Sequence, residues 1–146
     1  MIRLSRLFLL VGFVLGVARL GAADSMNMKS DILASYVKIS AALAADDFAA
    51  AKTAAAAVAE HAGMSDMNKA IAPKATAVAK AKDIDAARNA FKSLSAAVEP
   101  LAKGEKGYVV MNCPMIHADW IQTSQDVKNP YYGKMMLTCG APKSAK

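Results

Sequence analysis

Apolar residues recur every three or four positions through the first two thirds of the chain, which is the spacing of one buried face on an α-helix. This spacing predicts four helices, over residues 30–45, 48–62, 66–81 and 84–101. The repeat of the first helix consists of Ile32, Tyr36, Ile39 and Leu43. We therefore expect an all-α fold, an antiparallel bundle of about four helices arranged as two helical hairpins.

The residues at the ends of these segments favour separate helices. Asp47 and Asp83 stand where a side chain can cap the first turn of a helix, and Gly63 and Gly104 stand where helices commonly end. Pro73 falls inside the third segment. Because proline interrupts a helix, we expect either a kink there or a later start.

The pattern changes after Gly107. Residues 108–111 and 120–121 are short apolar runs with strand character, and residues 129–133 carry the Asn-Pro and Gly of a turn. These features predict a small irregular or short-stranded C-terminal cap over residues 108–140. We expect residues 30–140 to form a single domain, followed by a frayed tail at residues 141–146.

The first 23 residues have the pattern of a signal peptide. Arg3 and Arg6 precede an uncharged run of twelve residues, 7–18, and small residues lead up to a cleavage site after Ala23. Twelve residues rise only about 18 Å as a helix, against about 30 Å for a bilayer core, so we expect no stable membrane span after cleavage. The protein is then periplasmic, with a flexible N-terminus at residues 24–29. A retained, uncleaved leader is the alternative.

Charge and motif content narrow the function. The chain has 18 basic and 12 acidic residues, but the leader carries three of the basic ones and no acid, which leaves 15 against 12. With no Lys/Arg cluster and no aromatic platform, we expect no nucleic-acid partner. Two histidines, no phosphate-binding glycine loop and no nucleophile or zinc-protease motif argue against an enzyme.

The candidate chemistry lies in two sulfur-rich segments. Met111, Cys113, Met115 and His117 occupy alternate positions, which share one face of an extended chain. Met135, Met136 and Cys139 follow about twenty residues later. Thiolate, thioether and imidazole are the ligands that select soft ions, so the pattern predicts a Cu(I) or Ag(I) site.

Geometry leaves two interpretations of the cysteines open. Strand residues four apart are separated by about 13 Å, so Cys113 and His117 share an ion only if Pro114 bends the chain or the segment around Cys139 closes the site. In an oxidising compartment the alternative is a Cys113–Cys139 disulfide, which would leave only Met and His as ligands.

Other residues have structural and chemical interpretations. Trp120 is expected as a packing anchor or, alternatively, as a ring over a bound ion. Met26 and Met28 lie near the expected mature N-terminus. We expect them in a mobile tail, and the alternative is that they recruit copper. His61 stands near a helix end, where we expect it to be exposed and structural.

Several motifs of the chain occur together in one family. They are Y-V-V-M-N-C-P-M at 108–115, A-D-W-I at 118–121, N-P-Y-Y-G at 129–133, M-L-T-C-G at 136–140 and D-I-D-A-A-R-N-A-F at 83–91. With them the chain resembles, over about residues 30–140, a bacterial domain of unknown function. That domain occurs as a stand-alone exported protein and fused to the periplasmic adaptor subunits of copper/silver efflux systems. Cys113, Met115 and Cys139 are shared positions, whereas the loop that holds His117 is shorter here.

Residues and resemblance together lead us to expect a periplasmic Cu(I)- or Ag(I)-binding protein. It would buffer the ion or hand it to an efflux partner, either a periplasmic adaptor or another copper-handling protein. Cys113 and Met115 would be the main ligands, with Met135, Met136 and Cys139 closing the site and His117 as an auxiliary. The alternative is a structural or protein-interaction domain without metal, in which a Cys113–Cys139 disulfide staples the cap to the helices.

Overall fold

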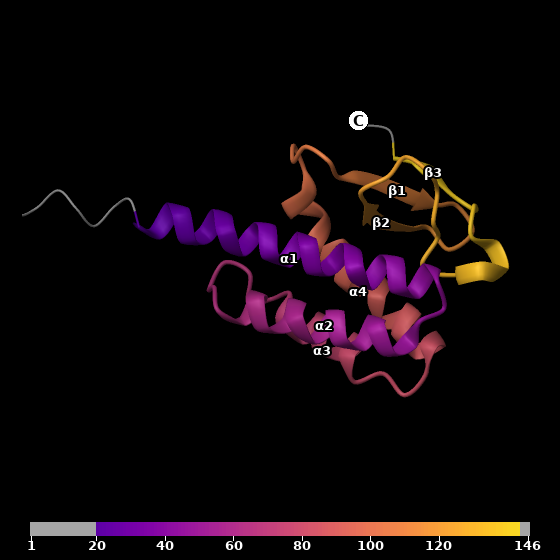
Figure 1. Ribbon diagram of the computed structural model, residues 1–146, viewed down its shortest axis with the longest axis horizontal. Helices are drawn as coiled ribbons and strands as arrows, with labels where there is room; N and C mark the ends of the chain where they lie inside the picture. Colours follow the sequence, from indigo (N-terminus) through magenta and orange to yellow (C-terminus); the bar gives the residue numbers. More distant parts are fainter. Residues whose placement is uncertain (1–19, 144–146) are drawn as a thin grey trace, which may run out of the picture.

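A computed structural model describes residues 20–143 of the chain (Figure 1). Four helices come first, α1 (Leu20–Ala44), α2 (Phe48–Gly63), α3 (Ala72–Ala79) and α4 (Ile84–Ala102). The strands β1 (Val109–Cys113) and β2 (Ala118–Gln122), the 3₁₀-helix η1 (Gly133–Met136) and the strand β3 (Ala141–Pro142) follow. The fold is thus mostly helical with a short-stranded C-terminal cap, as predicted.

The starts of α2 and α4 are fixed by the expected aspartate caps. The Asp47 carboxylate accepts a hydrogen bond from the Ala50 N–H at 2.9 Å, and the Asp83 carboxylate accepts one from the Ala86 N–H at 2.7 Å. Each bond satisfies an N–H that has no partner inside its helix. Both helices therefore begin at the residue that the sequence predicts.

The third helix starts late, which was one of the two outcomes expected from Pro73. Residues 66–71 form turns, and α3 begins at Ala72 with Pro73 in its first turn. Proline is tolerated there because its missing N–H would have no helical partner anyway. With eight residues α3 is shorter than the segment 66–81 that the sequence predicts. The arrangement of the helices as an antiparallel bundle of two hairpins stays a prediction.

The first helix is longer than the apolar repeat predicts. It begins at Leu20 and includes residues 24–29, which we expected to be flexible. The physical reason is that no proline or glycine interrupts residues 22–44, so nothing in the sequence stops the helix from extending. The predicted leader lies outside the described residues up to residue 19. None of the helices within residues 20–143 is long and apolar enough to cross a membrane.

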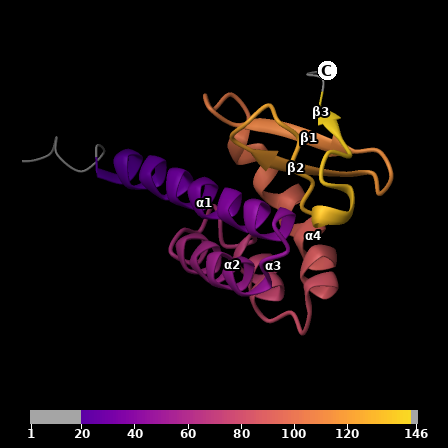
Figure 2. The ribbon, with the colours of Figure 1, turned by 45° about the vertical axis from the view of Figure 1, so that its right-hand side comes forward.

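The helices pack in chain order, α1 against α2, α2 against α3 and α3 against α4, with further contacts between α1 and α4. The contact face of α2 is built almost entirely of alanine, namely Ala51, Ala54, Ala55, Val58 and Ala62. Small side chains allow close approach of neighbouring helices but bury little area each. Much of the bulky core comes instead from α1, α4 and the cap, which lies against α1 and α4 in Figure 2.

The cap is a three-stranded antiparallel sheet in the order β2-β1-β3. In β1 and β2, Met111 pairs with Trp120 and Cys113 with Ala118. Residues 141–142, which we expected in a frayed tail, instead pair with Asn112 and Met111 as β3. The Lys143 ammonium adds a salt bridge to Asp119 at 2.6 Å. These contacts hold residues 141–143 against the sheet.

One buried hydrogen-bonded cluster joins the sheet to the helices, and we call Tyr36, Ser95 and Tyr131 the hydroxyl cluster. The Tyr36 and Ser95 hydroxyls lie 2.6 Å apart, and Tyr36 also accepts a bond from the Ile121 N–H in β2. Tyr131 donates to the Asp119 carbonyl of β2 and lies 3.3 Å from Ser95. The cluster therefore connects α1, α4, β2 and the connection between β2 and η1.

The hydroxyl cluster predicts a loss of stability at alkaline pH. Burial raises the pKa of Tyr36 and of Tyr131 well above their usual value, whereas both phenols ionise near pH 10 in the unfolded chain. The unfolded state therefore loses these protons first. The contribution of the two tyrosines to the free energy of unfolding does not change below pH 10. Above pH 10 it falls by up to about 1.4 kcal/mol per pH unit for each tyrosine.

Urea unfolding of the wild type and Tyr131→Phe at pH 8 to 11 measures this effect, and the comparison cancels the contribution of the lysines. We expect the free energy of unfolding of Tyr131→Phe to fall less steeply above pH 10. Equal slopes for the two proteins would contradict the buried state of this phenol.

Candidate functional site

The first sulfur-rich segment is divided between a strand and a turn. Met111 and Cys113 lie on the buried face of β1, but residues 114–117 form the turn to β2. The expectation that four alternate residues share one extended face is therefore wrong beyond Cys113. The reason is that β1 and β2 pair as a hairpin, and His117 takes up a positive φ of 49° to close it. Met115 and His117 are consequently exposed.

The two cysteines come together although 26 residues separate them in the sequence. Both are free thiols, with Cys113 buried at the end of β1 and Cys139 half-buried just after η1. Gly140, next to Cys139, packs against the carbonyl of Asn112, next to Cys113. Burial and the neighbouring Cys113 thiol raise the pKa of Cys139. The segment around Cys139 thus packs against Cys113. Closure by this segment and a bend at Pro114 were the two arrangements expected to let ligands share one ion.

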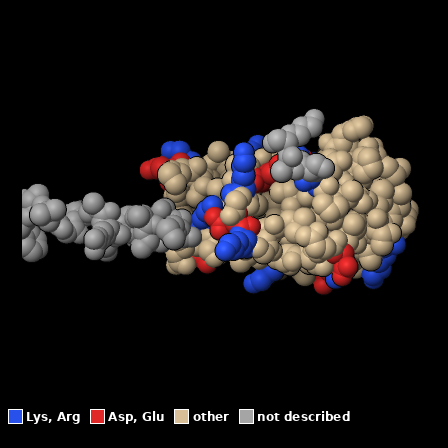
Figure 3. Space-filling model, turned by 90° about the horizontal axis from the view of Figure 1, so that it is seen from above, with Lys and Arg blue, Asp and Glu red and all other residues tan. Residues whose placement is uncertain are grey.

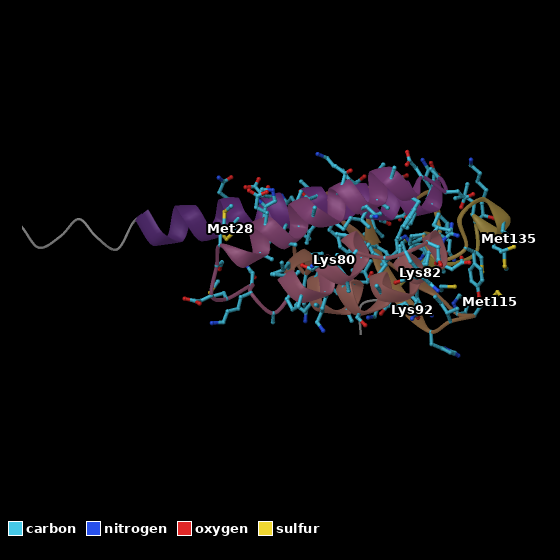
Figure 4. The ribbon with its side chains drawn as sticks, turned by 90° about the horizontal axis from the view of Figure 1, so that it is seen from below. Met28, Lys80, Lys82, Lys92, Met115 and Met135 are labelled. Atoms are coloured by element: carbon cyan, nitrogen blue, oxygen red, sulfur yellow. The ribbon has the colours of Figure 1, made fainter. Side chains whose placement is uncertain are left out.

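The methionines of the two segments lie around this thiol pair at one end of the molecule. Met115 is 57% exposed in the β1–β2 turn and Met135 is 80% exposed in η1, while Met136 is half-buried. Figure 4 shows Met115 and Met135 at the same end of the molecule. The arrangement is a pair of shielded thiols with exposed thioethers on both flanking segments.

A buried asparagine holds Cys139 in place. The Asn129 side chain donates to the Cys139 carbonyl at 2.6 Å and accepts from the Tyr131 N–H at 2.8 Å, while its own N–H donates to the Leu137 carbonyl at 2.7 Å. Asn129 is fully buried. From the sequence we treated it only as part of a turn. The Asn-Pro pair was the available signal, but the partner of its side chain lies ten residues away.

A second anchor fixes the start of η1. The Arg88 guanidinium bonds the Leu43 carbonyl, the Pro130 carbonyl and the Asp46 carboxylate, and this ion pair lowers the pKa of Asp46. Gly133 packs directly on the pair at a φ of +56°, where any Cβ would overlap both side chains. Arg88 therefore connects η1, and with it Met135, to the C-terminal end of α1 and the N-terminal part of α4.

Trp120 is a packing anchor. Its indole is fully buried, meets Tyr131 edge to face with ring centroids 6.0 Å apart, and donates to the Gln122 side chain at 2.9 Å. A Cβ on Gly140 would lie 2.5 Å from this ring. The close approach of Gly140 brings the residue next to Cys139 down onto the sheet.

The donors at this end are soft. Within residues 27–143 no three His, Cys, Asp or Glu residues are placed to hold an ion together. The further sulfur donors near the two thiols are those of the methionines. On the face seen in Figure 3, charged side chains are sparse over the sheet end of the molecule and lie mainly at its edges. Two thiols with thioethers fit Cu(I) or Ag(I) and do not fit Ca²⁺ or Mg²⁺.

Comparison with known proteins places the chain in a family. Residues 32–107 match the family described as protein of unknown function (DUF3347), and the chain belongs to that family. The match begins within α1, runs through α4 and ends before β1, so it does not include the two cysteines. A search of curated proteins and a search of solved structures each gave no significant match.

The role of Asn129 can be tested by substitution. Asn129→Ala leaves buried polar groups unpaired, so we expect a loss of about 1–3 kcal/mol in the free energy of unfolding. Because the Cys139 segment loses its anchor, we also expect its thiol to react faster with a thiol reagent than in the wild type. Gln125→Ala, which removes an exposed amide from the same connection, is the control. Unchanged Cys139 reactivity in Asn129→Ala would contradict the assigned role.

Proposed function

We propose that the protein binds Cu(I) or Ag(I) in the periplasm at the end of the cap, and buffers the ion or hands it to an efflux partner. The observation that carries the proposal is the proximity of Cys113 and Cys139, which lie 26 residues apart in the sequence, beside exposed methionines. Thiolate and thioether sulfur are the donors that select these ions over the harder divalent metals. No catalytic role is proposed.

The residues differ in the roles that their burial supports. Cys113 and Cys139 are the shielded ligands and would hold the ion most tightly. Met115 and Met135 are exposed and would complete the site or receive the ion from outside. His117 and Met136 are auxiliary, His117 because it lies in the exposed turn and Met136 because it is half-buried.

Binding would be coupled to proton release. Because the pKa of Cys139 is raised, its thiol keeps its proton at neutral pH, while a metal binds the thiolate. The affinity for the ion is then lower than that of a preformed thiolate pair and rises with pH.

The same contact favours a second candidate function. Two neighbouring thiols in an oxidising compartment can form a disulfide, which would fix the cap as part of a structural or protein-interaction domain. In that state only the methionines and His117 remain as ligands. The two functions therefore differ in whether the reduced thiols bind an ion.

The family resemblance supports the partner in this proposal. The motifs around Cys113 and Cys139 resemble those of domains that are fused to adaptor subunits of copper/silver efflux systems. A stand-alone protein with the same motifs would deliver the ion to such an adaptor or to another copper-handling protein. Export depends on the leader in residues 1–23, whose predicted pattern is that of a cleaved signal peptide.

Anaerobic competition for Cu(I) against a chromophoric chelator tests the proposal on the reduced full chain. We expect Cys113→Ser and Cys139→Ser each to weaken binding by at least about tenfold, since even outer-shell changes weaken metal sites by that factor. Met115→Leu and Met135→Leu should have smaller effects, because they conserve volume and leave the thiols in place.

Lys134→Gln is the matched control, because Lys134 is exposed in η1 beside Met135 but is not a proposed ligand. It should leave the competition at the cap unchanged. Thermal melts of each variant separate loss of ligand from loss of fold. If the wild type takes no Cu(I) from the chelator and Cys113→Ser only lowers the melting temperature, the disulfide-stapled domain is the better account.

A further inference from the structure

The large apolar side chains that are exposed within residues 27–143 are all methionines. Within residues 27–143 the large apolar side chains classed as exposed are Met64 at 62%, Met67 at 79%, Met115 at 57% and Met135 at 80%. Every leucine, isoleucine, valine and aromatic residue in that range is at least partly buried. Methionine that fills gaps in a core would be buried with them. Only thioethers, and no large hydrocarbon side chains, are exposed in this range. This selective exposure indicates a use for their sulfur at the surface.

These methionines form two pairs at opposite ends of the molecule. Met115 and Met135 belong to the proposed cap site. Met64 and Met67 lie in the connection between α2 and α3, which is at the other end of the helices from the β1–β2 turn and η1 (Figures 1 and 2). Figure 4 shows Met28 of α1 at this second end as well. The proposed function does not use this pair.

A histidine lies on the same helical face as Met64. Met64 follows the last residue of α2 and keeps right-handed helical angles, with φ −77° and ψ −8°. His61, three residues earlier, is therefore its neighbour one turn away, with Cβ atoms about 5–6 Å apart. An imidazole and a thioether at this spacing can reach one ion together.

The connection that carries Met67 is held in place by its own turn. The Asn68 N–H donates to the Ser65 carbonyl at 3.1 Å, and the Ile71 N–H donates to the Asn68 carbonyl at 2.8 Å. Asn68 is buried, so the turn is anchored while Met67 next to it projects into solvent. Asp66 is paired with Lys69 at 3.0 Å, and both side chains are exposed to solvent. The soft donors at this end are the imidazole nitrogen of His61 and the thioether sulfurs of Met64 and Met67.

We propose that His61, Met64 and Met67 form a second binding site for a soft monovalent ion, Cu(I) or Ag(I), independent of the cysteines at the cap. Its ligands are neutral and form no disulfide, so the site works in an oxidising compartment whatever the state of Cys113 and Cys139. Without thiolate it binds more weakly than the cap and exchanges its ion readily. The protein would then present soft-ion sites at both ends.

Nuclear magnetic resonance of the methionine methyl groups tests this site with Ag(I) as the probe. The protein is the full chain with Cys113→Ser and Cys139→Ser, labelled with ¹³C in the methionine methyls, so that failure of the cap site does not affect the result. We expect the Met64 and Met67 signals to shift together and to saturate with Ag(I). The buried Met111 signal, which the ion cannot reach, is the internal control.

The variant His61→Gln decides whether these residues act as one site. We expect it to raise the Ag(I) concentration at half-saturation by about tenfold or more, as for loss of a metal-site partner. Met64 and Met67 signals that do not shift would overturn the proposal. Shifts that are equally strong in His61→Gln would also overturn it, because they would reflect separate exposed thioethers.

Discussion

The hydrogen bonds among the buried hydroxyls of Tyr36, Ser95 and Tyr131 determine where the cap lies on the helices. Tyr36 comes from α1 and Ser95 from α4, and their hydroxyls meet the backbone of β2 directly or through Tyr131. Phe91 fills the space beside them, with its ring centroid 5.1 Å from that of Tyr36 and 5.8 Å from that of Tyr131. Because alanine-rich helices bury little area, this polar and aromatic contact carries much of the connection between the two parts. The position of the two cysteines follows from it.

Rigid support and exposed donors are combined in the cap. Asn129 fixes the backbone of Cys139, and Arg88 fixes the segment of Met135. The thiols are shielded behind these anchors, while the thioethers of Met115 and Met135 face solvent. In the proposed function, an ion from solution meets thioether sulfur first and thiolate second. A site held by a prearranged shell binds without a large rearrangement of the chain.

Local features were predicted well from the sequence, and features that depend on distant contacts were not. The starts of α2 and α4 follow from Asp47 and Asp83, whose side chains act within their own first turns. The strand β3 is two residues long and exists only because β1 lies beside it. The sulfur-rich segments were identified from residue types, but their closure depends on the hydroxyl cluster and on Asn129. The straight alternation through His117 failed because the hairpin turn begins directly after Cys113.

The central claim is that Cys113 and Cys139 bind one soft ion together. X-ray absorption spectroscopy of the reduced full chain loaded with one equivalent of Cu(I) tests it most directly, because it reports the elements bonded to copper. The account predicts a first shell of sulfur only, with fewer sulfur neighbours in Cys139→Ser. A first shell dominated by nitrogen or oxygen, or a spectrum that Cys139→Ser leaves unchanged, would contradict it.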